Sequence, residues 1–184
     1  FGCKSSLEAQ ESKKKWFPYN KGGSFRKWYG NQEYVINWLN DGEEIRNFDK
    51  AVIRNPSYYF KEGITWSFVS SSNFGVRYTP NGFIFDVGGS SIFPNNDWIY
   101  YVTAYLCSKL SFKFLQYINP TLNFQVGNIG DLPIVFNEKE KSEIDRLAIQ
   151  NINISKNDWD FFETSWNFKQ HPFLTFRGEA KTLE

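Results

Sequence analysis

The spacing of apolar residues changes once along this chain, near residue 95, and that change limits the possible fold more than any other feature. Before it, three runs rich in β-branched and aromatic residues (64–71, 74–80 and 83–93) are separated by Ser, Asn, Pro and Gly, which favour turns. After it, in 97–118, apolar residues recur every three to four positions, as on one side of a helix. We therefore predict an α+β fold: a β-rich centre, built as a meander of several short strands, followed by buried helices.

Shorter elements are expected before this centre. The polar residues 1–13 indicate a flexible N-terminal segment. Strands are expected at 15–19 (KWFPY) and 33–38 (EYVINW), and the acidic residues at the start of 41–53 favour a short helix there. The Gly-Gly pair in 20–32 indicates a loop or short helix held by aromatic residues.

After the centre, residues 121–136 are expected to return to extended structure. Asn137 can cap a helix that runs to about residue 150, because its side chain can accept a hydrogen bond from the first-turn amides. Ser155 and Asp158 repeat the capping spacing, so the aromatic stretch WDFFETSW (159–166) is expected to begin a second capped helix or a turn. We assign 14–136 to one domain and 137–184 to a C-terminal helical segment and tail.

Composition narrows the class of protein only partly. The chain has 184 residues, with 21 Lys and Arg against 20 Asp and Glu, so net charge alone does not indicate a nucleic-acid partner. It begins at Phe1 and contains no Met, so we expect a fragment of a larger protein. The longest apolar-rich run, 98–107, is shorter than the ~20 residues of a membrane span. Free cysteines and the lack of a signal-peptide pattern favour the cytoplasm.

Catalytic and metal-binding patterns are missing from the sequence. One histidine, His171, and two distant cysteines do not form a metal-binding spacing. The stretch NPSYYF (55–60) is similar to the Asn-Pro-Pro-Tyr/Phe loop with which amino-group methyltransferases hold a flipped base, but Ser57 replaces the second proline. A Gly-rich turn after a strand, which would hold S-adenosylmethionine, is also missing. We expect a turn at 55–60 and no catalysis by this chain.

Three carboxylates near the end of the chain, Asp158, Asp160 and Glu163, allow two interpretations. A carboxylate pair for glycoside hydrolysis is not excluded by spacing alone, because folding brings distant residues together. The simpler interpretation is that acidic residues favour the first turn of a helix, and that Trp159 and nearby aromatic residues form one apolar stripe.

Basic residues interleaved with aromatic ones are the features that favour DNA. Lys and Arg beside a Gly-rich backbone suit phosphate contacts, and Ser or Asn side chains on a loop can reach base edges. A solvated basic face and a core of aromatics remain the alternative. The candidate DNA-contacting residues are Lys15, Lys21, Gly22, Gly23, Arg26, Lys27, Arg54, Lys61, Ser70, Ser71, Ser72, Asn73 and Arg77.

Several long strings carry a more specific signal. Three of them are KWFPYNKGGSFRKWYGNQEYVINWLNDG, YFKEGITWSFVSSSNFGVRYTPNGFIFDVGGSSIF and LNFQVGNIGDLPI, and a fourth, ISKNDWDFFETSWNFKQHPFL, lies near the end of the chain. Together, over about residues 14–175, they resemble the region after the catalytic domain in PglX-type adenine-specific DNA methyltransferases of BREX phage-defence systems. They are also similar to the related fused restriction–methylation enzymes.

The resemblance implies a division of labour. Residues 14–136 would be a target-recognition domain that grips double-stranded DNA, while an absent catalytic domain binds S-adenosylmethionine and methylates a flipped adenine. This chain would itself hold no cofactor. Its partners would be DNA, the rest of its own polypeptide and other phage-defence proteins. Two other classes stay open: a docking domain of the defence complex, and a carbohydrate-binding module that uses the aromatics.

Overall fold

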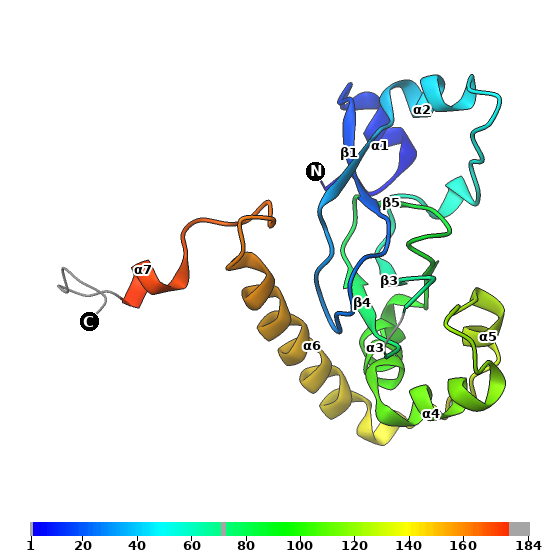
Figure 1. Cartoon of the computed structure of the whole chain (residues 1–184), viewed down its shortest axis with the longest axis vertical. Helices are drawn as coiled ribbons and strands as arrows, with labels where there is room; N and C mark the ends of the chain where they lie inside the picture. The colour runs from blue at the N-terminus through cyan, green and yellow to red at the C-terminus, as the bar shows by residue number, and fades with distance from the viewer. Residues whose placement is uncertain (1, 71–72, 177–184) are drawn as a thin grey trace.

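Two small sheets and a set of helices make up the fold, which confirms the predicted α+β class. The computed structural model describes residues 2–70 and 73–176. In Figure 1 the sheets lie one above the other, with short helices at both ends of the pair and the long helix α6 along one side. The helices are α1 (Ser6–Glu11), α2 (Leu39–Arg46), α3 (Ile99–Cys107), α4 (Lys109–Ile118), α5 (Val126–Gly130), α6 (Glu138–Asp160) and α7 (Pro172–Phe176).

The first sheet has the strand order β2-β1-β5. Strand β1 (Trp16–Asn20) pairs antiparallel with β2 (Tyr34–Asn37), close to where the sequence predicts them. On its other side β1 pairs in parallel with the two-residue strand β5 (Ile84–Phe85), which comes from the β-rich centre.

The second sheet has the order β4-β3-β6. Strand β3 (Gly63–Trp66) lies between β4 (Val76–Thr79) and β6 (Ser91–Ile92), antiparallel to both. The expected meander is therefore wrong in its connectivity, because β5 leaves this sheet and joins the first one. The reason is apolar burial: Ile84 is 1% exposed in a cluster formed with residues of the first sheet.

Helical segments differ from the expectation in three places. Helix α1, capped by the Ser5 side chain, lies in the N-terminal segment. Helix α5 occupies part of 121–136, where extended structure was expected. Helix α2 contains a left-handed turn at 40–42. A 3-10 turn, η1 (Pro56–Tyr58), confirms the turn expected at 55–60, and a second, η2 (Asn96–Trp98), precedes α3.

Helix α6 begins where Asn137 predicts and continues ten residues past the expected end. The Asn137 side chain accepts a hydrogen bond from the Lys139 amide. The expected capped start at WDFFETSW is wrong, because the helix ends at Asp160 and this stretch forms its C-terminus. Ser155 lies inside the helix and its hydroxyl donates instead to the carbonyl of Lys27, 128 positions earlier in the chain.

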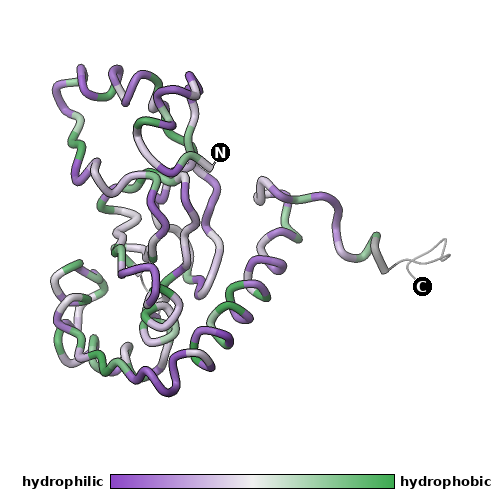
Figure 2. Tube along the Cα trace, turned by 180° about the vertical axis from the view of Figure 1, so that it is seen from behind, coloured by the Kyte–Doolittle hydropathy of each residue, from purple (hydrophilic) through white to green (hydrophobic). Residues whose placement is uncertain are grey.

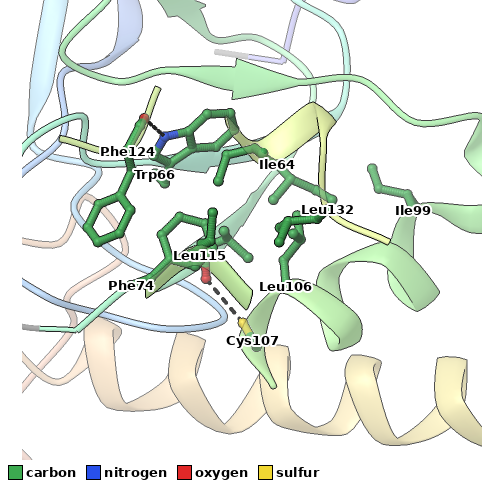
Figure 3. Close-up of a cluster of buried hydrophobic side chains, with 11 residues drawn as sticks. Ile64, Trp66, Phe74, Ile99, Leu106, Cys107, Leu115, Phe124 and Leu132 are labelled. Carbon is green, nitrogen blue, oxygen red and sulfur yellow. Dashed lines mark hydrogen bonds between the residues drawn. The ribbon is translucent and has the colours of Figure 1, made fainter. Parts of the chain in front are cut away.

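The main core lies between the second sheet and helices α3, α4 and α5 (Figure 3). Trp66 is fully buried at its centre, and its indole N–H donates to the Phe124 carbonyl at 2.8 Å, so the large ring is buried without an unsatisfied donor. The expected burial of α3 is confirmed, since Ile99 and Leu106 lie in this core. A second cluster around Phe17 and Phe60 fills the space between the first sheet, α1 and α2.

The thiol of Cys107 is expected to be unreactive in the folded chain. The residue is 5% exposed, and burial raises the pKa of its thiol to about 11, so almost no thiolate forms at pH 8. Labelling with a thiol reagent at pH 8 should modify Cys3, which is half-buried, and modify Cys107 only after denaturant is added. Equal labelling rates for both cysteines in the folded chain would contradict this.

Apolar and polar residues alternate along α6, as the hydropathy colouring of Figure 2 shows. Its buried residues Ala148, Ile152 and Trp159 face the rest of the domain, whereas Leu147 and Ile154 are exposed. In the described part of the chain, no helix combines the length and apolar character needed to cross a membrane.

Candidate nucleic-acid interface

Two glycine pairs, Gly22-Gly23 and Gly88-Gly89, bring two backbone segments into close contact between the sheets. A Cβ at Gly22, where φ is +87°, would lie 2.5 Å from the Gly88 carbonyl oxygen, and one at Gly89 would lie 2.2 Å from that of Asn20. Only glycine fits such an approach, since a methyl group would overlap backbone atoms that cannot turn away. The crossing places Lys21, Gly22 and Gly23 beside the turn that links β5 to β6.

Ser67 connects this loop to strand β4. Its hydroxyl donates to the Gly23 carbonyl at 2.9 Å and accepts a hydrogen bond from the Arg77 guanidinium at 3.5 Å. Ser70 and Asn73 line the same small cavity as Ser67 and Arg77. The structure thus brings Gly23, Ser70, Asn73 and Arg77 together, whereas the candidates Ser71 and Ser72 lie outside the described residues.

Arg77 differs from its expected role as an open phosphate contact. Its side chain is 2% exposed, and it lines a small cavity together with Ser67, Ser70 and Asn73. Burial lowers the pKa of the Arg77 guanidinium to about 10, so the group still carries its charge at neutral pH.

A larger pocket of about 450 Å³ lies between the segment after α2 and the start of α5. Its walls carry a cation, an amide, a carboxylate and a hydroxyl beside apolar side chains, and they include Arg54, Asn55, Phe68, Asp86, Ser90 and Val126. Burial, together with the neighbouring Asp86 carboxylate, raises the pKa of Tyr19 behind it. Such a mixture of polar groups and aromatic walls suits a ligand with hydrogen-bonding edges and a flat face.

Among the pocket residues, sequence reasoning found only Arg54. Asn55 was visible in the sequence as the first residue of NPSYYF, but was assigned only to a turn. It adopts a left-handed conformation, with φ of 52°, at the start of η1. Asp86 and Ser90 flank the second glycine pair, a signal that could have drawn attention to them.

Arg26 and Lys27 are held by other parts of the chain. The Arg26 guanidinium forms an ion pair with Asp158 and lies 5.0 Å from the ring centre of Trp159. The Lys27 ammonium donates to the Cys107 carbonyl at 2.7 Å. Both cations therefore attach the 24–32 loop to α6 and α3, and neither is an open phosphate contact in this structure.

The remaining basic candidates are scattered. Lys15 lies 5.3 Å from the ring centre of Trp16 and borders a pocket with Glu43, while Lys61 lies 4.9 Å from that of Tyr58. Lys21 is exposed beside the glycine crossing. Among the basic candidates, Lys21 is exposed beside the glycine crossing and Arg54 is exposed at the wall of the 450 Å³ pocket. We call the surface formed by Lys21, the glycine crossing and this pocket the glycine face.

Two of the three carboxylates near the end of the chain, Asp158 and Asp160, have structural partners. Asp158 pairs with Arg26, and Asp160 pairs with Lys156 and accepts a hydrogen bond from Ser165. Among the described residues, no group of three or more His, Cys, Asp or Glu side chains is arranged to hold a metal ion. The expectation that these carboxylates lie in the first turn of a helix is wrong, because Asp158 and Asp160 lie in the last turn of α6, where each pairs with a neighbouring cation.

Comparison with known proteins identifies relatives over nearly the whole chain. It is 46% identical over 169 residues to the adenine-specific methyltransferase BrxX of Escherichia coli O9:H4 (strain HS), covering 90% of this chain and 14% of that protein. It is 43% identical over 179 residues to the adenine-specific methyltransferase PglX of Lacticaseibacillus casei (strain Zhang), covering 93% of this chain and 15% of that protein.

No family model matches the chain. The chain spans about one seventh of the length of the curated relatives it matches. The chain is therefore homologous to one segment of the adenine-specific methyltransferases BrxX and PglX, which confirms the PglX-type resemblance of its sequence.

Proposed function

We propose that this chain is the DNA-binding target-recognition domain of an adenine-specific DNA methyltransferase of the BREX phage-defence type. In the whole protein, which works in the cytoplasm, another domain would bind S-adenosylmethionine and methylate an adenine flipped out of the duplex. Flipping a base costs a few kcal/mol, and contacts to the flanking duplex by this domain would offset that cost.

The observation that carries the proposal is the glycine face. It combines two exposed cations, Lys21 and Arg54, with a pocket of about 450 Å³ at whose wall Asn55 is exposed. Exposed cations suit phosphates, and an exposed side-chain amide suits a base edge. The Asp86 carboxylate lies in the same pocket and offsets part of the positive charge of Lys21 and Arg54.

A docking role has some support of its own. Leu147 and Ile154 on α6 and its C-cap Phe161 recur every seven residues and are 43%, 60% and 44% exposed. A stripe with this period suits packing against another helix. Docking and DNA binding use different surfaces, so both can belong to one domain. Aromatic residues are divided between the cores and the surface, where Trp16, Tyr34 and Tyr117 are exposed, so a carbohydrate-binding module is distinguished from a DNA-binding domain by its ligand.

The proposal predicts salt-sensitive binding to a labelled random-sequence duplex, measured by fluorescence anisotropy across a salt titration. Because each phosphate contact releases counterions, Lys21→Gln and Arg54→Gln should each reduce the slope of log Kd against log salt by about 1. Lys139→Gln, which removes an exposed cation at the start of α6, is the matched control and should leave the slope unchanged.

Three outcomes separate the alternatives. Unchanged slopes in both test variants would show that DNA contacts a surface other than the glycine face. A lack of binding at low salt would contradict DNA recognition by this chain and favour the docking role of α6. Salt-insensitive binding of oligosaccharides would favour the carbohydrate-binding class.

A further inference from the structure

Arg77 is a buried cation without an anionic partner among the described residues. Its side chain is 2% exposed, and no carboxylate in that part of the structure lies within ion-pairing distance. The guanidinium makes one hydrogen bond there, the long contact of 3.5 Å to Ser67, and its Nε–H is buried without an acceptor. A guanidinium has five N–H donors, so most of its hydrogen-bonding capacity is unused.

Neighbouring groups do not compensate for this charge. The Cys107 thiol is close to Arg77, but burial raises its pKa to about 11, so it is neutral at physiological pH. The Arg26 guanidinium is near enough to act on Arg77, and its charge is repulsive. A charge that is buried and unpaired destabilises the folded chain, and this favours an occupant that supplies an anion.

We propose that Arg77 forms the base of a phosphate-binding site, which in the DNA complex takes a backbone phosphate beside the glycine face. This proposal rests on the proposed function for its DNA source, but the site would also accept inorganic phosphate. The planar fork of arginine matches the geometry of phosphate oxygens, and Ser67 contributes a hydroxyl beside it. The aromatic walls formed by Phe25, Phe74 and Phe124 exclude water and strengthen the contact.

The site is closed in this structure, and two exposed side chains lie at its edge. The cavity at Arg77 has a volume of about 10 Å³, which is room for about one water molecule. Two of its lining residues, Phe25 and Asn73, are exposed, so their side chains can turn outward into solvent. Phosphate binding therefore requires these two side chains to move, while Arg77 and Ser67 stay in place.

The test follows the Nε–Hε resonance of Arg77 by NMR in the 184-residue chain, with that resonance assigned from its absence in Arg77→Lys. Sodium phosphate is titrated at constant ionic strength against sodium chloride. The expected result is a saturable shift of the Arg77 resonance, with a much smaller change for the exposed Arg146. A resonance that stays unchanged with phosphate and with a short duplex would overturn the proposal.

Melting temperature provides a second measurement in the same buffers. Arg77→Met removes the unpaired charge, so this variant should melt at or above the wild-type temperature without phosphate and should lose the phosphate-dependent rise. An equal rise in both proteins would overturn the site. If Arg77→Met does not fold, the wild-type resonance still decides the question.

The duplex separates this site from the proposed function. A shift with inorganic phosphate, together with no duplex binding in the anisotropy assay, would support the anion site and contradict DNA recognition. Duplex binding whose affinity is unchanged in Arg77→Lys, with no shift of the Arg77 resonance, would support DNA recognition and contradict the anion site. A shift with both ligands, and about tenfold weaker duplex binding in Arg77→Met, would support both.

Discussion

Replacing Trp159 with alanine is expected to lower the free energy of unfolding by about 3–5 kcal/mol. The indole is 5% exposed, packs with Tyr29 and Ile152, and lies under the Arg26 guanidinium. Truncation leaves a cavity between α6 and the 24–32 loop and removes the flat face on which Arg26 rests. Urea denaturation followed by circular dichroism measures the change without depending on the fluorescence of the lost indole.

Phe162→Ala is the matched control, because this aromatic residue three positions later is 53% exposed. It should change the free energy of unfolding by less than about 0.5 kcal/mol. Equal destabilisation by both variants would show that the whole WDFFETSW stretch is packed. Unchanged stability of Trp159→Ala with weakened DNA binding would instead make this stretch part of the DNA-contacting surface.

The second large effect is expected at the glycine crossing. Gly22→Ala should destabilise the chain by about 2 kcal/mol or more, because a Cβ there would overlap the Gly88 carbonyl and because φ of +87° disfavours any L side chain. The same substitution should weaken duplex binding, since the loop that carries Lys21 must move away from the β5–β6 turn. Thermal melting and the anisotropy assay measure the two effects.

Gly127→Ala on α5 is the control for this substitution. A Cβ at Gly127 would meet nothing within 4 Å, and alanine favours helix over glycine by about 1 kcal/mol. The variant should therefore be as stable as wild type or more stable. Similar destabilisation by both glycine variants would contradict close packing at Gly22 as the cause.

Local patterns along the sequence were sufficient to predict the class of fold and several element positions. Strand β2 and the start of α6 depend on β-branched residues and on a capping asparagine, which act on near neighbours in the chain. The position of β5 was not predictable in this way. A strand of two residues is too short to show a periodic pattern in the sequence. The sheet that β5 joins is decided by the burial of Ile84 in the second cluster.

Some residues of the candidate site were predictable from local sequence, whereas those that depend on long-range contacts were not. Gly22, Gly23 and Arg54 do lie on or beside the glycine face, because turn chemistry and exposed charge are local properties. The roles of Arg26 and Arg77 were not predictable. The carboxylate partner of Arg26 lies 132 positions later in the chain. The burial of Arg77 depends on its contacts with Ser67 and the other residues that line the small cavity.

The 24–32 loop has a further consequence for association between molecules. Strand β4 is the edge of its sheet, and Trp28 occupies part of that edge: its N–H donates to the Val76 carbonyl, and its own carbonyl accepts from the Tyr78 N–H, both at 2.8 Å. Exposed sheet edges are templates for strand addition and aggregation. Because Ser155 and Asp158 hold this loop from α6, the long helix also protects the chain from edge-to-edge self-association.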